Sequence, residues 1–182
     1  MDKQSGQLTH NDLTISLSDE KALTMEQGLA DTLDSSSAVH SWGAFYTKST
    51  TLYNEEGGSA DVSIVGAEDD ARMTEYFTFR TRVGHDPIPF EEDSVILTEK
   101  TALNLELSVG DTFYVEAADG SRVPLVLTGI TENYMFTRLY LSGAQLESLL
   151  GGTPEWNTVY GLTGCTTEAE DNALRTKLLD CN

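Results

Sequence analysis

The chain has 182 residues, with 11 Lys and Arg against 30 Asp and Glu, so its formal net charge is −19 at pH 7. Hydrophobic residues at 39% and charged residues at 23% are typical of globular proteins and exclude wholesale disorder. The negative charge repels phosphate backbones and anionic lipids, so we expect no nucleic acid partner and no basic face for membranes. No stretch approaches the ~18 apolar residues of a membrane-spanning helix.

The first part of the chain predicts a β-α-β unit. Leu13, Ile15 and Leu17 alternate with polar residues, which is typical of a half-buried strand. Ser18 is a helix N-cap candidate, and the apolar residues after it recur at helical spacing, at Ala22, Met25, Leu29 and Leu33. The run 34–37 ends this helix. Residues 39–53 are rich in aromatic and β-branched side chains and predict a long strand or a bent pair.

The middle of the chain has a different, strand-rich pattern. After a turn at 54–58, it predicts a strand, a short helix, a loop, a strand and a short helix over residues 60–66, 70–80, 83–93, 94–97 and 98–103. A hairpin follows, in which residues 113–117 pair with residues 123–130. Its turn contains Asp119-Gly120, a strong hairpin signal.

The last part of the chain returns to alternating strands and helices. It predicts a strand at 139–142, a helix at 144–150 that ends at Gly151, and a strand at 159–162. Thr167 and Glu170 form a capping box for a final helix, whose apolar face contains Leu174 and Leu178.

This order predicts an α+β fold with two lobes. Residues 1–54 and 154–182 together form a discontinuous α/β lobe, made of β-α-β from one end of the chain and β-α from the other. Residues 55–153 form a β-rich lobe inserted into it. Such an insertion brings the two termini close together, as expected of a domain that is itself an insertion.

The search for catalytic residues is mostly negative, so we expect no enzyme. The sequence contains no nucleophile elbow, phosphate-binding loop, dinucleotide fingerprint or zinc protease motif. His10, His40 and His85 lie far apart, and each is read as a surface or packed histidine. A Ser-His-Asp triad assembled in space stays open, because triads are recognised by geometry rather than by sequence order.

We also expect no metal or cofactor. Cys165 and Cys181 lack metal-site spacing, and the helix predicted between them holds their Cα atoms about 20 Å apart. A disulfide requires less than about 7 Å, so we expect two free thiols. The acidic runs 68–70 and 91–93 do not match a calcium-binding loop and are interpreted as solvated surface.

The aromatic residues Tyr134, Met135, Phe136 and Trp156 have two equally open interpretations. If exposed, they contact a partner or cargo, since aromatic residues and Met are enriched at interfaces. Alternatively, they cap the small β core.

One region resembles a known family. Residues 95–130 (VILTEKTALNLELSVGDTFYVEAADGSRVPLVLTGI) are similar to a segment of FtsX-like, MacB-type ABC transporter permeases. Residues 129–134 (GITENY) and 139–142 (LYLS) resemble a pattern of large permeases of Gram-positive bacteria. Gly66 and the stretch to Phe79-Arg80 match the preceding piece, so the resemblance covers about residues 60–150. Gly129 is interpreted as permitting a bend or bulge.

The resemblance implies an architecture and a location, and transfers no catalytic residue. In this family an extracytoplasmic domain lies between two transmembrane helices, with a porter-like α/β lobe and a sabre-like β-rich lobe. ATP hydrolysis in a separate cytoplasmic subunit moves the domain, and a second permease half is a further implied partner. Because this chain lacks transmembrane segments, we interpret it as a monomeric fragment of a cell-membrane protein. Its negative charge predicts that it stands away from anionic lipid.

Two alternatives to a mechanical role in transport remain at this stage. The domain recognises a peptide, an antibiotic or a cell-wall component directly, or, as a weaker alternative, it is a secreted hydrolase. A hydrolase requires one of the histidines beside a carboxylate and a Ser or Thr in one pocket.

Overall fold

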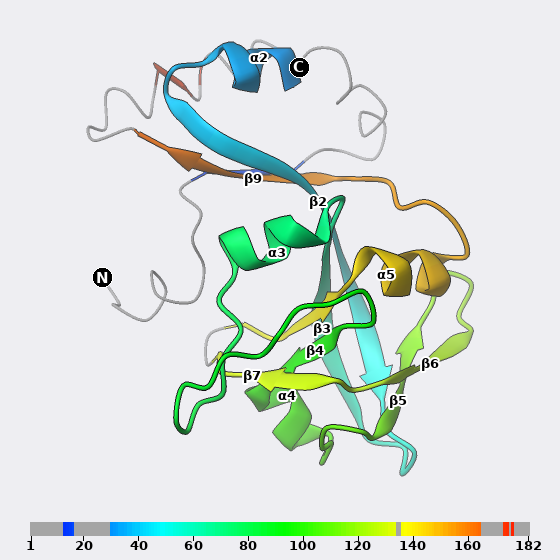
Figure 1. Cartoon of the computed structure of the whole chain (residues 1–182). Coiled ribbons are helices and arrows are strands. Elements are labelled where there is room, and N and C mark those ends of the chain that lie inside the picture. The colour runs from blue at the N-terminus through cyan, green and yellow to red at the C-terminus, as the bar shows by residue number, and fades with distance from the viewer. Residues whose placement is uncertain (1–12, 17–29, 134–135, 165–172, 175, 177–182) are drawn as a thin grey trace. The chain divides into compact units, whose positions relative to one another are not determined.

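The computed structural model describes residues 13–16, 30–133, 136–164, 173–174 and 176. These residues divide into two compact units. One contains residues 46–154, and the other is built from two separate stretches, 13–45 and 155–176. The strand β2 (Val39–Tyr53) crosses the boundary, since its first seven residues belong to one unit and the rest to the other. The whole length of β2 is visible in Figure 1.

The unit made from both ends of the chain contains a small antiparallel sheet. Its order is β1 (Leu13–Ser16), β9 (Thr158–Thr163) and the first half of β2. Both β1 and β2 are antiparallel to β9, so they run parallel to each other, as a β-α-β connection requires. The helix α2 (Ala30–Ser35) contributes Leu33 to a buried cluster with Leu13, Val159 and Leu174.

The other unit contains the rest of the sheet. From the second half of β2 the order is β3 (Ser59–Ala67), β8 (Arg138–Leu141), β4 (Val95–Thr98) and β7 (Gly129–Thr131). The hairpin of β5 (Thr112–Glu116) and β6 (Arg122–Val126) joins β2 through β5. Three short helices accompany these strands, α3 (Asp70–Tyr76), α4 (Glu99–Asn104) and α5 (Gly143–Leu150).

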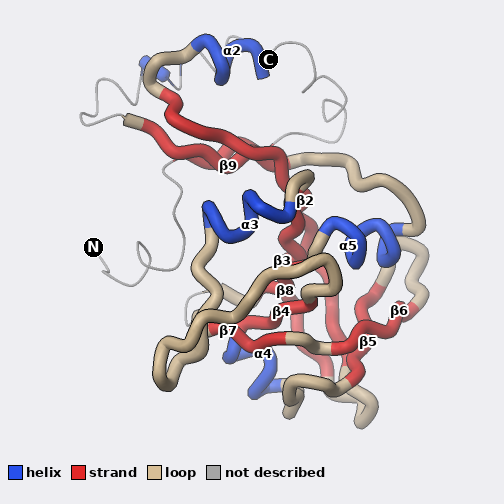
Figure 2. Tube along the Cα trace, viewed as in Figure 1, coloured by secondary structure: helices blue, strands red, loops and turns tan. Residues whose placement is uncertain are grey.

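Most of the expected elements are confirmed, and the mixed sheet with few helices confirms the α+β class. The strand at 39–53 is a single long strand, and the segment 83–93 is a loop (Figure 2). Gly151 ends α5 in the left-handed conformation, with φ of 69°. The capping box at Thr167, the two cysteines and most of the expected helix after Ser18 lie outside the described residues.

Two boundaries were wrong. The helix expected over 70–80 ends at Tyr76, because Phe77 is extended and its N–H bonds to the carbonyl of Met73. The expected strand 123–130 is two strands. Between them, Thr128 leaves the hairpin and exchanges hydrogen bonds with the backbone of Val95. After that break β7 pairs in parallel with β4, a partner distant in sequence.

Among the described residues, no helix combines the length and the apolar character that crossing a bilayer requires.

Gly129 is required by a close approach of neighbouring side chains. A Cβ at this position would lie 2.9 Å from Cγ2 of Ile88 and 3.3 Å from Cγ1 of Ile96. We therefore expect Gly129→Ala to lower the free energy of unfolding by about 2 kcal/mol through overpacking, measured by urea denaturation. The matched control is Gly152→Ala, since a Cβ there meets no atom within 4 Å, and it should change stability by less than about 0.5 kcal/mol. Equal losses in the two variants would contradict this account.

Candidate functional site

An aromatic cluster lies against the strand β8. Tyr140 packs on Phe77 and Phe79, with ring centroids 5.2 Å and 5.0 Å apart, and Phe79 stacks on Phe90 at 5.2 Å. Phe77 and Phe79 point to one side because the chain is extended after α3. This explains the early end of α3, since a continued helix would place them on different faces.

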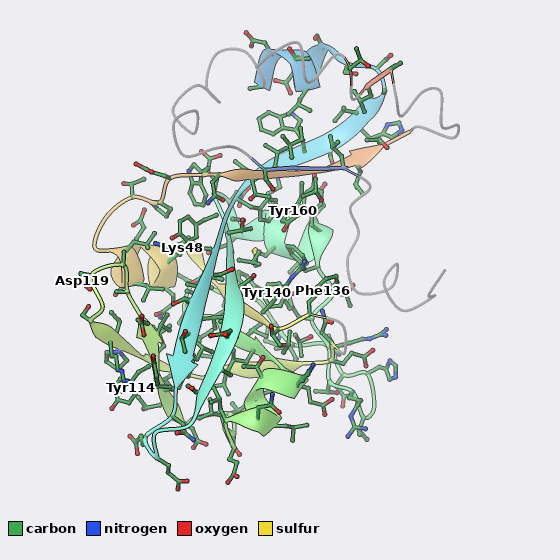
Figure 3. All side chains as sticks on the ribbon, turned by 180° about the vertical axis from the view of Figure 1, so that it is seen from behind. Lys48, Tyr114, Asp119, Phe136, Tyr140 and Tyr160 are labelled. Carbon is green, nitrogen blue, oxygen red and sulfur yellow. The ribbon has the colours of Figure 1, made fainter. Side chains whose placement is uncertain are left out.

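Arg138 links this aromatic cluster to an exposed aromatic ring. It lies two residues before Tyr140 on β8 and therefore projects from the same face. Its guanidinium carbon lies 5.6 Å from the centre of the Phe77 ring and 4.6 Å from the centre of the Phe136 ring. Phe136 is 43% exposed, so the stack ends in an aromatic ring at the surface (Figure 3). Arginine and aromatic side chains in this arrangement attract through the ring quadrupole.

The backbone around Phe136 is held by buried polar side chains. The amide of Phe136 donates to Oδ1 of Asn133 at 3.1 Å, and the amide of Arg138 donates to the hydroxyl of Thr98 at 3.1 Å. Asn133 is 6% exposed and Thr98 is fully buried. The backbone that carries the exposed Phe136 ring is therefore held at two amides, which lowers the entropy lost when this segment makes a contact.

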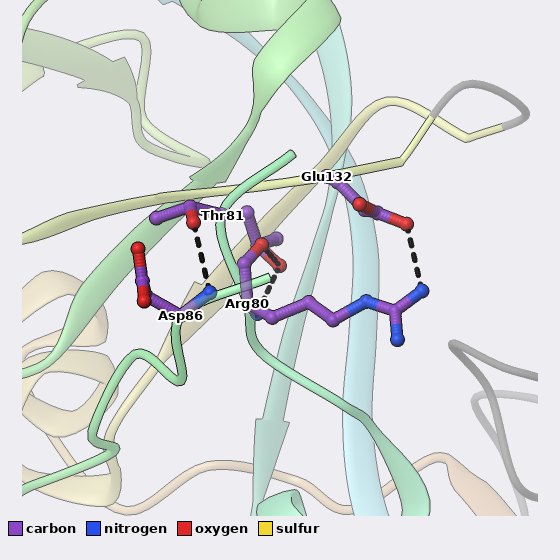
Figure 4. A network of polar contacts seen from close by, with 5 residues as sticks. Arg80, Thr81, Asp86 and Glu132 are labelled. Atoms are coloured by element: carbon purple, nitrogen blue, oxygen red, sulfur yellow. Dashed lines mark hydrogen bonds and ion pairs between the residues drawn. The ribbon is translucent and has the colours of Figure 1, made fainter. Parts of the chain in front are cut away.

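A nearly buried ion pair lies beside this region, between Arg80 and the residue that follows β7. Arg80 donates through Nη2 to Oε1 of Glu132 at 2.9 Å, and the Glu132 side chain is only 8% exposed. The backbone of Arg80 is also tied to Thr131, which accepts from its amide and donates to its carbonyl, and to the amide of Glu132. Figure 4 shows this network together with the neighbouring turn, in which the amide of Asp86 donates to the hydroxyl of Thr81.

The contact residues expected from the sequence fall in different places. Tyr134 and Met135 lie outside the described residues. Phe136 is exposed, and Trp156 is half-buried and belongs to the other unit. Sequence reasoning missed Arg138, although its alternation with Tyr140 placed it on the face of that tyrosine.

Two residues of the acidic run 68–70, which was interpreted as solvated surface, cap helices. Asp69 accepts from the amide of Ala71 and caps α3, while Asp70 accepts from the amide of Gly143 at the start of α5 at 2.8 Å. Negative side chains at helix N-termini are stabilising, so these residues join two helix ends.

The described residues show no arrangement suited to catalysis. Within this part of the chain, no three His, Cys, Asp or Glu side chains are placed to hold a metal ion. His40 and His85 lie in different units, are exposed, and make no hydrogen bond or ion pair with another described residue. His10 lies outside the described residues.

The fold is similar to solved extracytoplasmic domains of ABC transporter permeases. The extracellular domain of the noncanonic ABC-type transporter YknZ from Gram-positive bacteria is 17% identical, over 92% of this chain and 91% of that one, with a TM-score of 0.56. The periplasmic region of MacB from Actinobacillus actinomycetemcomitans is 14% identical, over 99% of this chain and 87% of that one, with a TM-score of 0.55. No family model and no curated protein matches the sequence. The resemblance of residues 60–150 to MacB-type permeases is thus confirmed for the fold.

The Arg80–Glu132 pair gives a prediction for stability. In the Arg80→Met variant the Glu132 carboxylate stays buried without its cation, so we expect the free energy of unfolding to fall by about 3 kcal/mol. Arg72→Met is the matched control, because it breaks an exposed pair with Glu75 and should cost less than about 1 kcal/mol. Urea unfolding midpoints at unchanged slope measure both values. If the two variants lose the same stability, the pair does not hold this region.

Proposed function

We propose that this chain is the extracytoplasmic domain of an ABC transporter permease and that it acts without catalysis. The observation that supports the proposal is the shared fold, which extends over nearly the whole of this chain and of the YknZ extracellular domain. The sequence resemblance is a second line of support, because it rests on the amino-acid pattern of residues 60–150 and not on the comparison of folds. On this proposal the domain lies on the outer side of the cell membrane.

The two lobes of the family are proposed for this chain as well. The unit built from both chain ends corresponds to the porter-like lobe, because β1 and β2 run parallel with β9 between them. The unit that contains residues 46–154 corresponds to the β-rich, sabre-like lobe. The sequence boundaries proposed for the lobes are 1–54 with 154–182, and 55–153. They differ from the compact units mainly at residues 46–54, the second half of β2 and the residue after it, which the units place with residues 55–153.

The domain is further proposed to transmit movement from a separate ATP-binding subunit. The strand β2 supports this, because it belongs to both units and is paired along its length. Residues 39–45 pair with β9, and Leu52 and Tyr53 pair with β5.

We propose that Tyr134, Met135, Phe136 and Trp156 are contact residues for cargo or a partner subunit. Phe136 supports the proposal, because its exposed ring is stacked on Arg138 and its backbone amide is held by Asn133. Binding energy at interfaces concentrates in aromatic and arginine side chains.

The location of the domain is tested by labelling the full-length protein in intact cells. Ser49 is exposed on β2, and the Ser49→Cys variant is made after replacing Cys165 and Cys181 by serine. We expect a membrane-impermeant maleimide to label this cysteine without permeabilisation. A cysteine placed in the ATP-binding subunit is the control and should react only after lysis. If the Ser49→Cys variant also requires lysis, the domain is not extracytoplasmic.

The contact surface is tested by photo-crosslinking in the assembled transporter. We expect Phe136→p-benzoylphenylalanine to give a cross-linked product with cargo or a second subunit on irradiation. The matched control is Leu103→p-benzoylphenylalanine, since Leu103 is also exposed, at 69%, but lies on α4 away from the stack. Equal yields at the two positions would remove Phe136 from the contact surface, without affecting the assignment of the domain.

A further inference from the structure

A groove of about 390 Å³, lined by both apolar and polar side chains, lies within the unit of residues 46–154. Its floor is formed by Tyr46, Lys48 and Thr50 of β2 with Ile64 of β3. One wall is the tip of the β5–β6 hairpin, and the other is the C-terminal turn of α5. The labelled Lys48 and Asp119 mark the floor and the hairpin wall in Figure 3. This volume falls within the range of roughly 300 to 1,000 Å³ that is usual for small-molecule sites.

Lys48 is the cation of this groove. Strand alternation places its side chain on the same face as Tyr46 and Thr50, over the groove floor. The side chain is exposed and forms no ion pair with any residue that the structure describes. Lys100 is likewise exposed and forms no ion pair with a described residue, so Lys48 is distinguished by its position in the groove rather than by being unpaired.

The carboxylates of the groove already have hydrogen-bond partners other than Lys48. Oε2 of Glu116 accepts from the Tyr53 hydroxyl at 2.6 Å, and this bond raises the pKa of Tyr53. Oδ1 of Asp119 accepts from the hydroxyl and the amide of Ser121, and these two bonds lower the pKa of Asp119. Asp119 therefore stays ionised at neutral pH and has its second oxygen left for a ligand.

The end of α5 adds acceptors to the same groove. Gly151 donates to the carbonyl of Glu147 and ends the helix, so the carbonyls of the next three residues have no partner within the helix. Residues 148–151 line the groove, and the last turn contains no basic side chain. The C-terminal end of a helix carries partial negative charge, which favours an ammonium group.

We infer that this groove binds a short peptide with free termini, whose carboxylate pairs with Lys48 and whose ammonium group is held by Asp119 and the carbonyl end of α5. A simple anion fits less well, since it would meet Glu116, Asp119 and the helix end without compensation. A simple cation would leave Lys48 unpaired. The apolar side chains of Ile64 and Leu149 give the middle of the ligand a dry contact.

The inference does not depend on coupling to an ATP-binding subunit. It is tested on the 182-residue chain in solution, so its failure leaves the proposed transport role untouched, and failure of that role leaves the groove untouched. The probe is trialanine with free termini, titrated into the millimolar range against the ¹⁵N-labelled chain. We expect chemical-shift changes in residues that line the groove, such as Thr50, Ser121 and Gly151.

The charges are tested with matched variants and matched ligands. Lys48→Met should weaken trialanine binding by about tenfold or more, as should amidation of its carboxylate. Asp119→Asn, which keeps an acceptor for Ser121, and N-acetylation of the peptide should weaken it in the same way. Lys100→Met and Asp93→Asn replace exposed charges elsewhere and should leave the affinity unchanged.

Three outcomes would overturn the inference. The first is the absence of shift changes at groove residues. The second is binding that Lys48→Met leaves unchanged. The third is equal binding of the free and the doubly blocked peptide, which would show that the termini are not recognised.

Discussion

The burial of the Glu132 carboxylate is the constraint on which the exposed end of the aromatic cluster depends. A carboxylate that is 8% exposed has lost most of its water, so it requires a cation and hydrogen bonds in return. Arg80 supplies the cation, and the chain after α3 must therefore run beside β7. The same backbone pairing fixes the end of β7 at Thr131, two residues before Asn133. Asn133 in turn orients Phe136, and Arg138 follows on β8.

The few basic side chains of this acidic chain are used mainly in specific contacts. With 30 acidic residues against 11 basic ones, most carboxylates face water and cost little, because water screens them. The described arginines are used mainly as partners of carboxylates or aromatic rings. Arg80, Arg82 and Arg72 form ion pairs, while Arg122 and Arg138 lie over aromatic rings. Lys48 has no such partner among the described residues, and its position in the groove is what leaves its ammonium group for a ligand on the inference above.

Local patterns in the sequence predicted the elements well but not their partners. The aromatic and β-branched content of residues 39–53 identified β2 over its full length as a long strand or a bent pair, and Asp119-Gly120 located the hairpin turn, because both signals depend on neighbouring residues. The division of residues 123–130 was missed, since Thr128 turns toward Val95, which is 33 residues away. The stack of Phe77, Arg138 and Phe136 was missed for the same reason. Phe136 was identified by its residue type, whereas Arg138 acquires its role from a strand register that no local pattern encodes.

Most of the residues on which the family resemblance rests make contacts that stabilise the fold. Gly129 makes room for Ile88 and Ile96, Glu132 pairs with Arg80, and Asn133 accepts a hydrogen bond from the amide of Phe136. Such residues identify an architecture, but they are not available to distinguish one ligand from another. On the proposals made above, recognition depends on side chains that folding leaves exposed, and Phe136 and Lys48 are of this kind. A shared fold at 17% identity is therefore compatible with a different ligand, because the positions that preserve the fold and those that select a partner are separate.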